Sequence, residues 1–257
     1  MQGQAEKVRI FHDLHRKGEP VILFNIWDPG SAKAVADAGA KAIATGSWPV
    51  AAAHGYADGE KIPLDLAMDN LRGIVDTVDV PVTCDLEGGY GTAPEVVAQT
   101  VERACMAGAV GFNFEDQIVG GEGLYGIDDQ VPRVAAAREA ADKFGASAFL
   151  NARTDLFLKA KPDTHTSAML DDAVERAKAY EQAGANGFFA PGLADEGLIA
   201  RLCEEIALPV NIIALPHVPD TKTLAGLGVA RISYGPVPYK RMTQWLEEEA
   251  TKALAGE

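Results

Sequence analysis

The sequence predicts one (β/α)8 barrel of the TIM type that spans residues 1–257. Eight short apolar runs, rich in β-branched and aromatic residues and bounded by Gly or Pro, alternate with longer, alanine-rich amphipathic runs. The chain has the usual length of such a barrel and contains no low-complexity segment or interdomain linker. The triplet Ala-Gly-Ala also recurs three times, each time just before an apolar run, as the joint of a repeating unit would.

The eight expected strands are short, and each ends near a turn-forming residue. An open, doubly wound sheet is the alternative architecture, but it normally carries a glycine-rich phosphate turn after its first strand. The stretch Asn-Ile-Trp-Asp-Pro-Gly-Ser is not such a turn, so a barrel is favoured. In chain order the expected strands cover residues 21–27, 42–46, 82–87, 111–116, 148–154, 187–192, 209–214 and 231–236.

The helices expected between these strands carry start and stop signals. One covers residues 93–108, with Thr92 as its N-cap and Gly108 as the residue that ends it, and another covers residues 170–185. The glycine of each Ala-Gly-Ala triplet supplies the left-handed residue that turns a helix into the next strand. The tail at 236–257 has the pattern of a charged amphipathic helix, which could close the barrel.

Composition and charge exclude several classes of function. The formal net charge is −14 at pH 7, and such an acidic surface disfavours nucleic acids and anionic membranes as partners. No stretch reaches the roughly 18–20 apolar residues of a membrane helix, and the N-terminus lacks the apolar run of a signal peptide. The three scattered cysteines form no C-x-x-C motif, which indicates a reducing compartment. We therefore expect a soluble, cytoplasmic protein.

Carboxylates gather at the carboxyl ends of the expected strands, where barrel enzymes place their active sites. Asp85 and Glu87 are two residues apart, so strand alternation predicts that both face the barrel mouth, about 6.6 Å apart, while Cys84 and Leu86 face the helices. Glu115 ends the next strand. Converging carboxylates repel one another, and Mg²⁺ relieves this repulsion with one or two carboxylates and several waters. The alternative is an acidic rim that binds no ion.

Arg153 ends the fifth expected strand, close to these carboxylates. A guanidinium at this place could grip a substrate carboxylate or phosphonate through two parallel hydrogen bonds. The alternative is a structural ion pair with Asp155 or Glu115.

Five motifs together resemble the isocitrate lyase / phosphoenolpyruvate mutase superfamily. The resemblance covers nearly the whole chain and implies a (β/α)8 barrel that binds Mg²⁺ or Mn²⁺. It implies small 2-oxo or 2-hydroxy carboxylate substrates, enolate-type intermediates and a homo-oligomer, dimer or tetramer, in which the last helix is often exchanged between subunits. The motifs are TGSWPVAAAHGYAD (45–58), VTCDLEGGYG (82–91), GFNFEDQ (111–117), NARTD (151–155) and VNIIA (210–214).

The resemblance also implies roles for individual residues. Asp85 and Glu87 match the acidic pair of the metal site, which is Asp-x-Asp in many members. Glu115 and Asp58 match further acidic residues that reach the metal, often through water. The positions that match substrate-binding residues are Gly46, Ser47, Trp48, Arg153 and Asn211.

The segment after the fourth expected strand departs from the family. Family lyases carry a lid there with the sequence Lys-(Lys/Arg)-Cys-Gly-His, whose cysteine protonates the departing enolate. Residues 117–130 contain no Cys, Lys or His, although four glycines make the segment pliable, as a lid should be. Tyr125 and Glu122 are the residues that could replace the cysteine as catalytic acid. Tyr125 carries a proton at neutral pH, whereas Glu122 would carry one only when buried.

The sequence therefore predicts a Mg²⁺-dependent lyase that cleaves a C–C bond of a small 2-hydroxy or 2-oxo carboxylate through an enolate. The alternatives within the superfamily are decarboxylation of an oxaloacetate-like acid and P–C bond chemistry on phosphonopyruvate. Because the lid cysteine is missing, a barrel that binds a carboxylate without catalysis is the alternative from another class.

Overall fold

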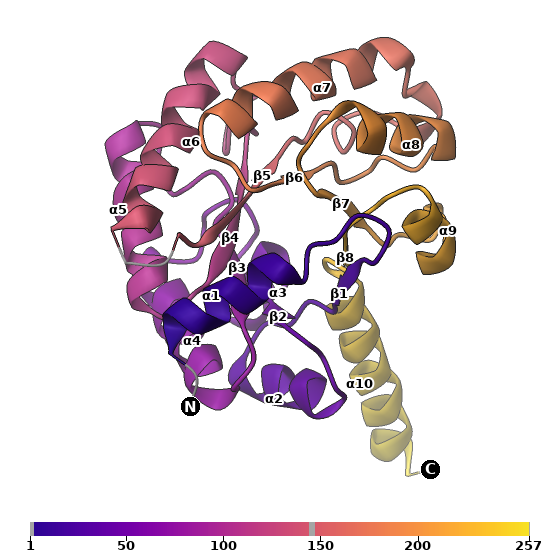
Figure 1. The fold of residues 1–257 in the computed structure, drawn as a ribbon. Coiled ribbons are helices and arrows are strands. Elements are labelled where there is room, and N and C mark those ends of the chain that lie inside the picture. The colour runs from indigo at the N-terminus through magenta and orange to yellow at the C-terminus, as the bar shows by residue number, and fades with distance from the viewer. Residues whose placement is uncertain (1–2, 144–146, 257) are drawn as a thin grey trace.

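Eight parallel strands form a nearly closed barrel with helices outside it (Figure 1). The computed structural model describes residues 3–143 and 147–256. Strands pair in the order β1-β8-β7-β6-β5-β4-β3-β2, and a parallel bridge between Ile26 and Thr45 continues the pairing between the two edge strands. The predicted fold class and all eight predicted strands are confirmed. The strands are β1 (Val21–Leu23), β2 (Ile43–Ala44), β3 (Val82–Asp85), β4 (Gly111–Glu115), β5 (Phe149–Arg153), β6 (Gly187–Phe189), β7 (Val210–Ile213) and β8 (Arg231–Ser233).

A helix follows each strand, and the helices after β1 to β7 return the chain to the start of the next strand. Two short elements, α3 (Ser47–Ala53) and the 3₁₀ turn η1 (Pro162–Thr164), lie in the loops at the carboxyl ends of β2 and β5. The remaining helices are α1 (Gln4–Asp13), α2 (Pro29–Asp37), α4 (Leu64–Thr77), α5 (Pro94–Met106), α6 (Ile127–Asp142), α7 (Ser167–Gln182), α8 (Glu196–Glu205), α9 (Thr221–Gly226) and α10 (Val237–Ala255).

The glycines of the three Ala-Gly-Ala triplets have the predicted left-handed backbone. Gly39, Gly108 and Gly184 have φ of 95°, 100° and 102°, where a residue with a side chain would be strained. The predicted N-cap Thr92 was wrong. Ala93 caps α5 without a side-chain hydrogen bond, because Pro94 at the first helical position already fixes φ for the first turn and needs no hydrogen-bond acceptor.

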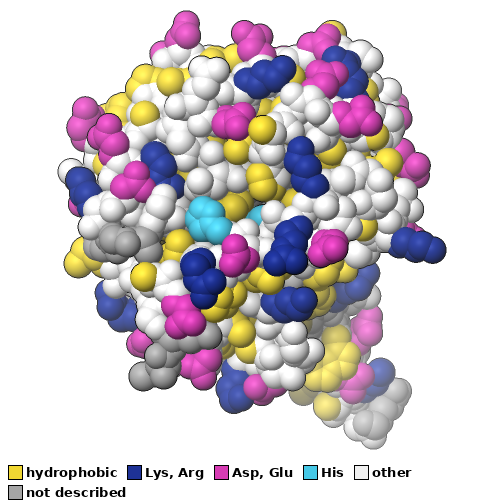
Figure 2. All heavy atoms as spheres, viewed as in Figure 1, with side chains coloured by type: hydrophobic (Ala, Val, Ile, Leu, Met, Phe, Trp, Pro, Cys, Tyr) yellow, Lys and Arg dark blue, Asp and Glu magenta, His cyan; other side chains and the backbone are white. Residues whose placement is uncertain are grey.

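Apolar side chains between the strands and the outer helices form one large core. Cys84 and Leu86 belong to it, as the alternation of β3 predicted. All three cysteines are buried and unpaired. Within the described residues, no helix has the length and hydrophobicity that crossing a bilayer requires. Acidic and basic side chains are interspersed over the face that carries α1 (Figure 2), so the net negative charge is not concentrated on this face.

The N-terminal segment closes one end of the barrel. Phe11 of α1 packs edge-on against Phe149 at the start of β5, with ring centroids 5.6 Å apart. The ring of His15 stacks on Phe149 at 4.0 Å. A Cβ at Gly111, the first residue of β4, would come within 2.8 Å of Phe11, so a larger residue there would displace this floor.

The interior of the barrel above this floor is polar. Arg231 of β8 is fully buried, and its Nη2 donates to Asn113 Oδ1 at 3.0 Å. Asn151 Nδ2 donates to Asn113 Oδ1 at 2.9 Å and to Asn211 Oδ1 at 3.1 Å. We call Asn113, Asn151, Asn211 and Arg231 the polar layer. It separates the floor from the carboxyl ends of the strands.

The C-terminal helix leaves the barrel and extends away from it (Figure 1). Its side chains Trp245, Leu246 and Leu254 are 60%, 55% and 89% exposed. The helix therefore does not close its own barrel along its length, and its exchange between subunits stays a prediction.

The burial of His15 in the barrel floor makes the stability of the fold depend on pH. Its Nδ1 lies 2.7 Å from the carbonyl oxygen of Phe11, and its Nε2 is buried without a partner among the described residues. Burial, together with the positive charge of Arg231, lowers the pKa of His15 from 6.5 to about 3. The folded state therefore disfavours the proton that the unfolded chain binds below pH 6.5.

We expect His15 to stabilise the fold above pH 6.5 and this contribution to be lost as the pH falls toward 3. The loss is up to about 1.4 kcal/mol per pH unit. Urea unfolding at pH 7 and pH 5 measures it. His15→Gln should show a smaller fall in the free energy of unfolding than the wild type. His217→Gln, at an exposed position, should behave as the wild type, and an equal fall in all three proteins would contradict the assignment.

Candidate active site

A cavity of about 250 Å³ opens at the carboxyl ends of the strands. All eight strands contribute to it, either directly or through the residues that follow them. Its lining is polar on the side of β3 to β5 and largely apolar on the side of β6 to β8. The predicted site residues that line it are Gly46, Ser47, Trp48, Asp58, Asp85 and Arg153.

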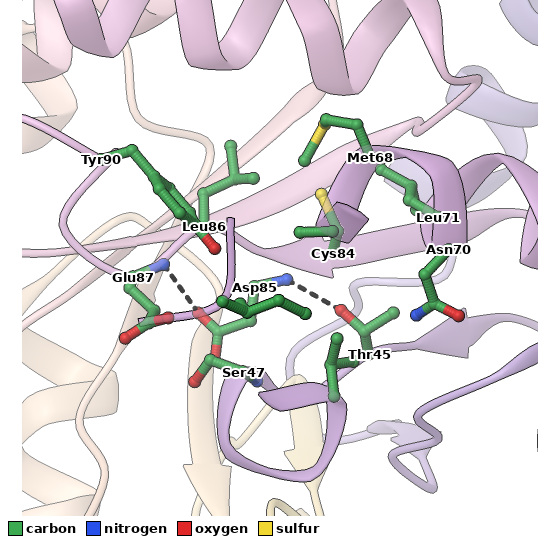
Figure 3. A pocket seen from close by; sticks show the side chains of 13 residues that line it. Thr45, Ser47, Met68, Asn70, Leu71, Cys84, Asp85, Leu86, Glu87 and Tyr90 are labelled. Atoms are coloured by element: carbon green, nitrogen blue, oxygen red, sulfur yellow. Dashed lines mark hydrogen bonds between the residues drawn. The ribbon is translucent and has the colours of Figure 1, made fainter. Parts of the chain in front are cut away.

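A second hollow of about 30 Å³ adjoins this cavity, and Ser47 and Asp85 line both. About one water fits a space of this size. Figure 3 shows Ser47, Asp85 and Glu87 beside one another in it, with Tyr90 on the far side of Glu87. Asp85 thus lies where the small hollow meets the main cavity.

Backbone amides anchor the carboxylate of Asp85 on both oxygens. The N–H of Ser47, the first residue of α3, donates to Oδ2 at 3.4 Å. The N–H of Glu87 donates to Oδ1 at 3.3 Å, and the N–H of Asp85 itself donates to Thr45 Oγ1 at 3.1 Å (Figure 3). Since two segments, residues 45–47 and 85–87, hold this residue through its side chain and its backbone, its position is fixed by the fold before any ligand arrives.

Glu87 reaches the site by a different route from the predicted one. The strand ends at Asp85, and Glu87 lies beyond it with φ of 51°, so the argument from strand alternation was wrong for this residue. Its Oε2 accepts a hydrogen bond from the N–H of Glu60 at 2.9 Å, and Glu60 Oε1 accepts one from the N–H of Tyr90 at 2.7 Å. Glu60 and Tyr90 also have positive φ, at 58° and 59°. Three strained residues in two loops that hydrogen-bond to each other are typical of functional sites.

Several acidic residues of this region have raised pKa values, because they are buried and lie close to other carboxylates. Burial, together with the carboxylates of Asp85 and Asp58, raises the pKa of Glu87 to about 8. Burial also raises the pKa of Asp58, with Asp85 as the next cause. Burial raises the pKa of Glu115 as well, although Arg153 opposes this rise. The cluster therefore has more negative charge than Arg153 alone neutralises.

Arg153 forms the structural ion pairs that were the alternative to a substrate clamp. Its Nε and Nη2 grip Asp155 at 2.5 and 2.9 Å, and its Nη1 lies 2.9 Å from Glu115 Oε2 and 3.9 Å from Asp85 Oδ2. Burial lowers the pKa of Arg153, but the carboxylates of Glu115, Asp155 and Asp85 outweigh it and raise this pKa above its ordinary value. The edge of the guanidinium that could hold a substrate carboxylate through two hydrogen bonds is thus occupied by Asp155. Arg153 still lines the cavity and contributes its positive charge there.

The donor set fits a hard divalent cation. Across residues 3–143 and 147–256, no three His, Cys, Asp or Glu side chains converge closely enough to enclose a metal ion by themselves. Asp85 and Asp58 both face the cavity, and Mg²⁺ typically takes one or two carboxylates and keeps several waters. Glu87 and Glu115 lie behind this pair, near enough for each pKa to respond to Asp85.

Asn211, predicted to bind substrate, does not line the cavity. It is buried in the polar layer, where its Nδ2 donates to Ser233 Oγ at 3.1 Å. Asn113 lines the cavity instead, and its Oδ1 accepts from both Asn151 and Arg231, so its amide N–H groups are left for a ligand. Strand alternation on β4 places Asn113 on the same face as Glu115, a signal that could have selected it. Asn25, Ser233 and Lys240 also line the cavity without having been predicted.

Neither predicted lid acid lines the cavity. Glu122 is exposed at the tip of the loop, and the ring of Tyr125 lies 4.0 Å from the guanidinium carbon of Arg133. An antiparallel bridge between Gln117 and Leu124 draws the loop into a small hairpin. Val119 of this hairpin packs over Gly88, where a Cβ would approach it to 2.9 Å, so the hairpin covers the β3 side of the site.

Comparisons with known proteins agree with this geometry. A family model described as phosphoenolpyruvate phosphomutase matches residues 11–254. An uncharacterised protein of Mycobacterium tuberculosis (strain ATCC 25618 / H37Rv) is 36% identical over 231 residues, which are 89% of this chain and 83% of that protein. Oxaloacetate decarboxylase of Pseudomonas fluorescens (strain SBW25) is 29% identical over 240 residues, covering 88% of this chain and 78% of the relative. The crystal structure of a "putative phosphonomutase" from Burkholderia cenocepacia J2315 has 48% identity and a TM-score of 0.94, covering 99% of this chain and 100% of that one.

Replacing Arg153 tests the buried ion pairs. Arg153→Lys keeps the charge but cannot hold Asp155 and Glu115 at once, so we expect a loss of about 2 kcal/mol in the free energy of unfolding. Arg103→Lys, at an exposed ion pair with Asp65, should change it by less than about 0.5 kcal/mol. Urea unfolding of both variants measures the difference. Equal stability of the two variants would show that the buried pairs do not stabilise the fold.

Replacing Asp85 tests the metal site. Asp85→Asn keeps an oxygen for the amide of Ser47 but loses the charge, so Mg²⁺ and Mn²⁺ should bind at least about tenfold more weakly while the fold survives. Titration calorimetry measures the affinity. Asp163→Asn, at an exposed position in η1, is the matched control and should bind the ions as the wild type does. Unchanged affinity in Asp85→Asn would remove Asp85 from the metal site.

Proposed function

The chain belongs to the phosphoenolpyruvate phosphomutase family, and on this premise we propose that it is a Mg²⁺-dependent lyase that breaks a C–C bond of a small 2-oxo carboxylate. The observation that carries the proposal is the anchored carboxylate of Asp85 in the lining of a cavity of about 250 Å³. Sites for drug-sized ligands typically occupy about 300–1,000 Å³. A smaller cavity suits an acid of a few carbon atoms.

Asp85 and Asp58 would hold the metal, Mg²⁺ or Mn²⁺, with Glu87 and Glu115 behind them. The bound ion would stabilise negative charge that develops on an enolate oxygen. Arg153 holds Glu115 and Asp85 in place and limits their mutual repulsion.

The neutral polar groups of the cavity would orient the substrate. The hydroxyl of Ser47 and the amide of Asn113 both face the cavity, and both can donate hydrogen bonds to carboxylate oxygens. Trp48 and the apolar side chains that follow β6 and β7 exclude water from the opposite side of the substrate.

Among C–C cleavages we favour decarboxylation of an oxaloacetate-like acid. Cleavage of a 2-hydroxy acid needs a protein group to protonate the departing enolate, whereas neither Tyr125 nor Glu122 lines the cavity. In decarboxylation the C3–C4 bond breaks, its electron pair becomes the enolate, carbon dioxide leaves, and water protonates C3 to give the product. The relative in Pseudomonas fluorescens named oxaloacetate decarboxylase supports this choice.

A substrate screen with Mg²⁺ and Mn²⁺ tests the proposal. Oxaloacetate, 2-hydroxy acids such as 2-methylisocitrate, and phosphonopyruvate are supplied in turn, and pyruvate release is followed. We expect metal-dependent pyruvate release from oxaloacetate, above the background of the metal alone. EDTA and Asp85→Asn should abolish it. Turnover of only a hydroxy acid or phosphonopyruvate would replace decarboxylation by that reaction, and binding without turnover of any acid would leave a non-catalytic barrel.

Variants of the lid decide whether it supplies an acid. If water protonates the enolate, Tyr125→Phe and Glu122→Gln should each keep kcat for oxaloacetate within about twofold of the wild type, because neither side chain reaches the cavity. Steady-state kinetics with Mg²⁺ measures this. A fall of more than about tenfold in kcat for either variant, with KM unchanged, would mark that residue as a proton donor.

A further inference from the structure

Lys240 brings a second positive charge to the cavity, from the side opposite the carboxylates. It belongs to the first turn of α10 and lines the cavity together with Gly235 and Pro236. Its Nζ lies 5.0 Å from the centre of the Trp48 ring, within the range of a cation–π contact. The lysine side chain thus extends over the cavity mouth.

Aromatic packing fixes the direction of this lysine. The ring of Tyr239 stands edge-on to Trp48 at 5.7 Å and to Trp27 at 5.0 Å. These contacts hold the start of α10 against the loops after β1 and β2. Because the first turn is held, the placement of Lys240 does not depend on where the distal part of the helix goes.

Lys240 and Arg153 differ in how their charges are used. Arg153 is shared among Glu115, Asp155 and Asp85. The ammonium of Lys240 forms no ion pair with any residue in the described parts of the chain. It makes a cation–π contact with the Trp48 ring. The adjoining wall, formed by Phe189, Ile213, Leu215 and other apolar residues, supplies no counter-charge. Lys240 is exposed, so water screens part of its charge. An anion placed between this wall and Lys240 would still interact more strongly than in open water, because the apolar wall screens charge less.

We propose that Lys240 determines substrate specificity by pairing with a second anionic group of the substrate, so that the site selects 2-oxo dicarboxylates over 2-oxo monocarboxylates. The inference rests on the proposed function and narrows its substrate class. The 2-oxo carboxylate end lies toward Asp85 and the metal, and the distal carboxylate lies toward α10. The acidic side of the cavity repels a second carboxylate, so this end is the favourable place for it.

The pairing acts on binding more than on the chemical step. In decarboxylation the distal carboxylate loses its charge as carbon dioxide leaves, so its ion pair with Lys240 is stronger in the bound substrate than in the transition state. Such an interaction lowers KM without raising kcat. A proton-donating lysine would have the opposite signature, a lowered kcat with little change in KM.

The test is steady-state kinetics on oxaloacetate with Mg²⁺ for Lys240→Met, with Lys240→Arg as the conservative variant. We expect KM to rise about tenfold in Lys240→Met, with kcat unchanged or slightly increased, and to return to within about threefold of the wild type in Lys240→Arg. Arg241→Met is the matched control, because it removes the same charge from the next residue of α10, which is exposed like Lys240 but does not line the cavity; its KM should stay near the wild-type value. An unchanged KM in Lys240→Met, or a fall in kcat at constant KM, would overturn the proposal.

Binding measurements separate this inference from the proposed reaction. Calorimetry with Mg²⁺ compares 2-oxoglutarate, a dicarboxylate, with 2-oxobutanoate, a monocarboxylate. Lys240→Met should weaken binding of 2-oxoglutarate about tenfold and leave 2-oxobutanoate unchanged, even if the wild type turns over no acid. Equal weakening of both acids, or of neither, would refute pairing with a distal carboxylate. Absence of turnover with selective binding would refute only the lyase.

Discussion

The ion pairs around Arg153 are the interaction on which the site depends. One buried guanidinium binds Asp155 at its own strand end, Glu115 on β4 and, at a longer distance, Asp85 on β3. Buried carboxylates that lack partners are costly, so without this arginine three neighbouring strands would end in uncompensated negative charge. The same pairs fix the heights at which the carboxylates meet the cavity. The ion pairs at the mouth therefore stabilise the packing of β3, β4 and β5, and this packing in turn holds the charged groups in place.

Beneath these ion pairs, the side chains of the polar layer are also buried polar groups that satisfy one another, here through hydrogen bonds. Asn113 accepts hydrogen bonds from Asn151 and Arg231, which orients its amide so that donors are left for the cavity. Arg231 is fully buried and has no carboxylate partner among the residues that the structure describes. Burial lowers its pKa to about 9, although Asp85 opposes this fall. The positive charge beneath the mouth favours anions above it. The polar layer and the mouth form one column of polar contacts above the aromatic floor and inside an apolar shell.

The cavity is thus divided between two chemical environments. On one side, anchored and strained residues concentrate carboxylates, an arrangement that suits a divalent cation and the polar end of an acid. On the other side, apolar residues and the ammonium of Lys240 suit the remainder of a substrate and a second negative charge. This division explains how a small cavity can orient a small acid, since its two ends meet groups of different charge.

The sequence by itself determined the barrel, its eight strands and its glycine joints, because a repeated pattern of apolar runs and left-handed turns is a local property. It also identified Asp85 and Arg153 at the cavity, since each lies within a regular strand whose alternation decides the face. The tertiary structure decided the rest. Glu87 lies past the strand end, where a left-handed turn replaces alternation.

The sequence pattern also cannot show how deep in the barrel a side chain lies, or whether a side chain from a distant helix reaches the cavity. Asn211 was predicted to bind substrate, but it pairs in register with Arg231 within the polar layer and so lies below the cavity. Lys240 belongs to a helix whose sequence has the charged pattern of an ordinary solvent-exposed helix, so the pattern does not single this lysine out. Only the packing of Tyr239 between Trp27 and Trp48 turns its first residues toward the cavity, and these three aromatic residues come from segments far apart in the chain.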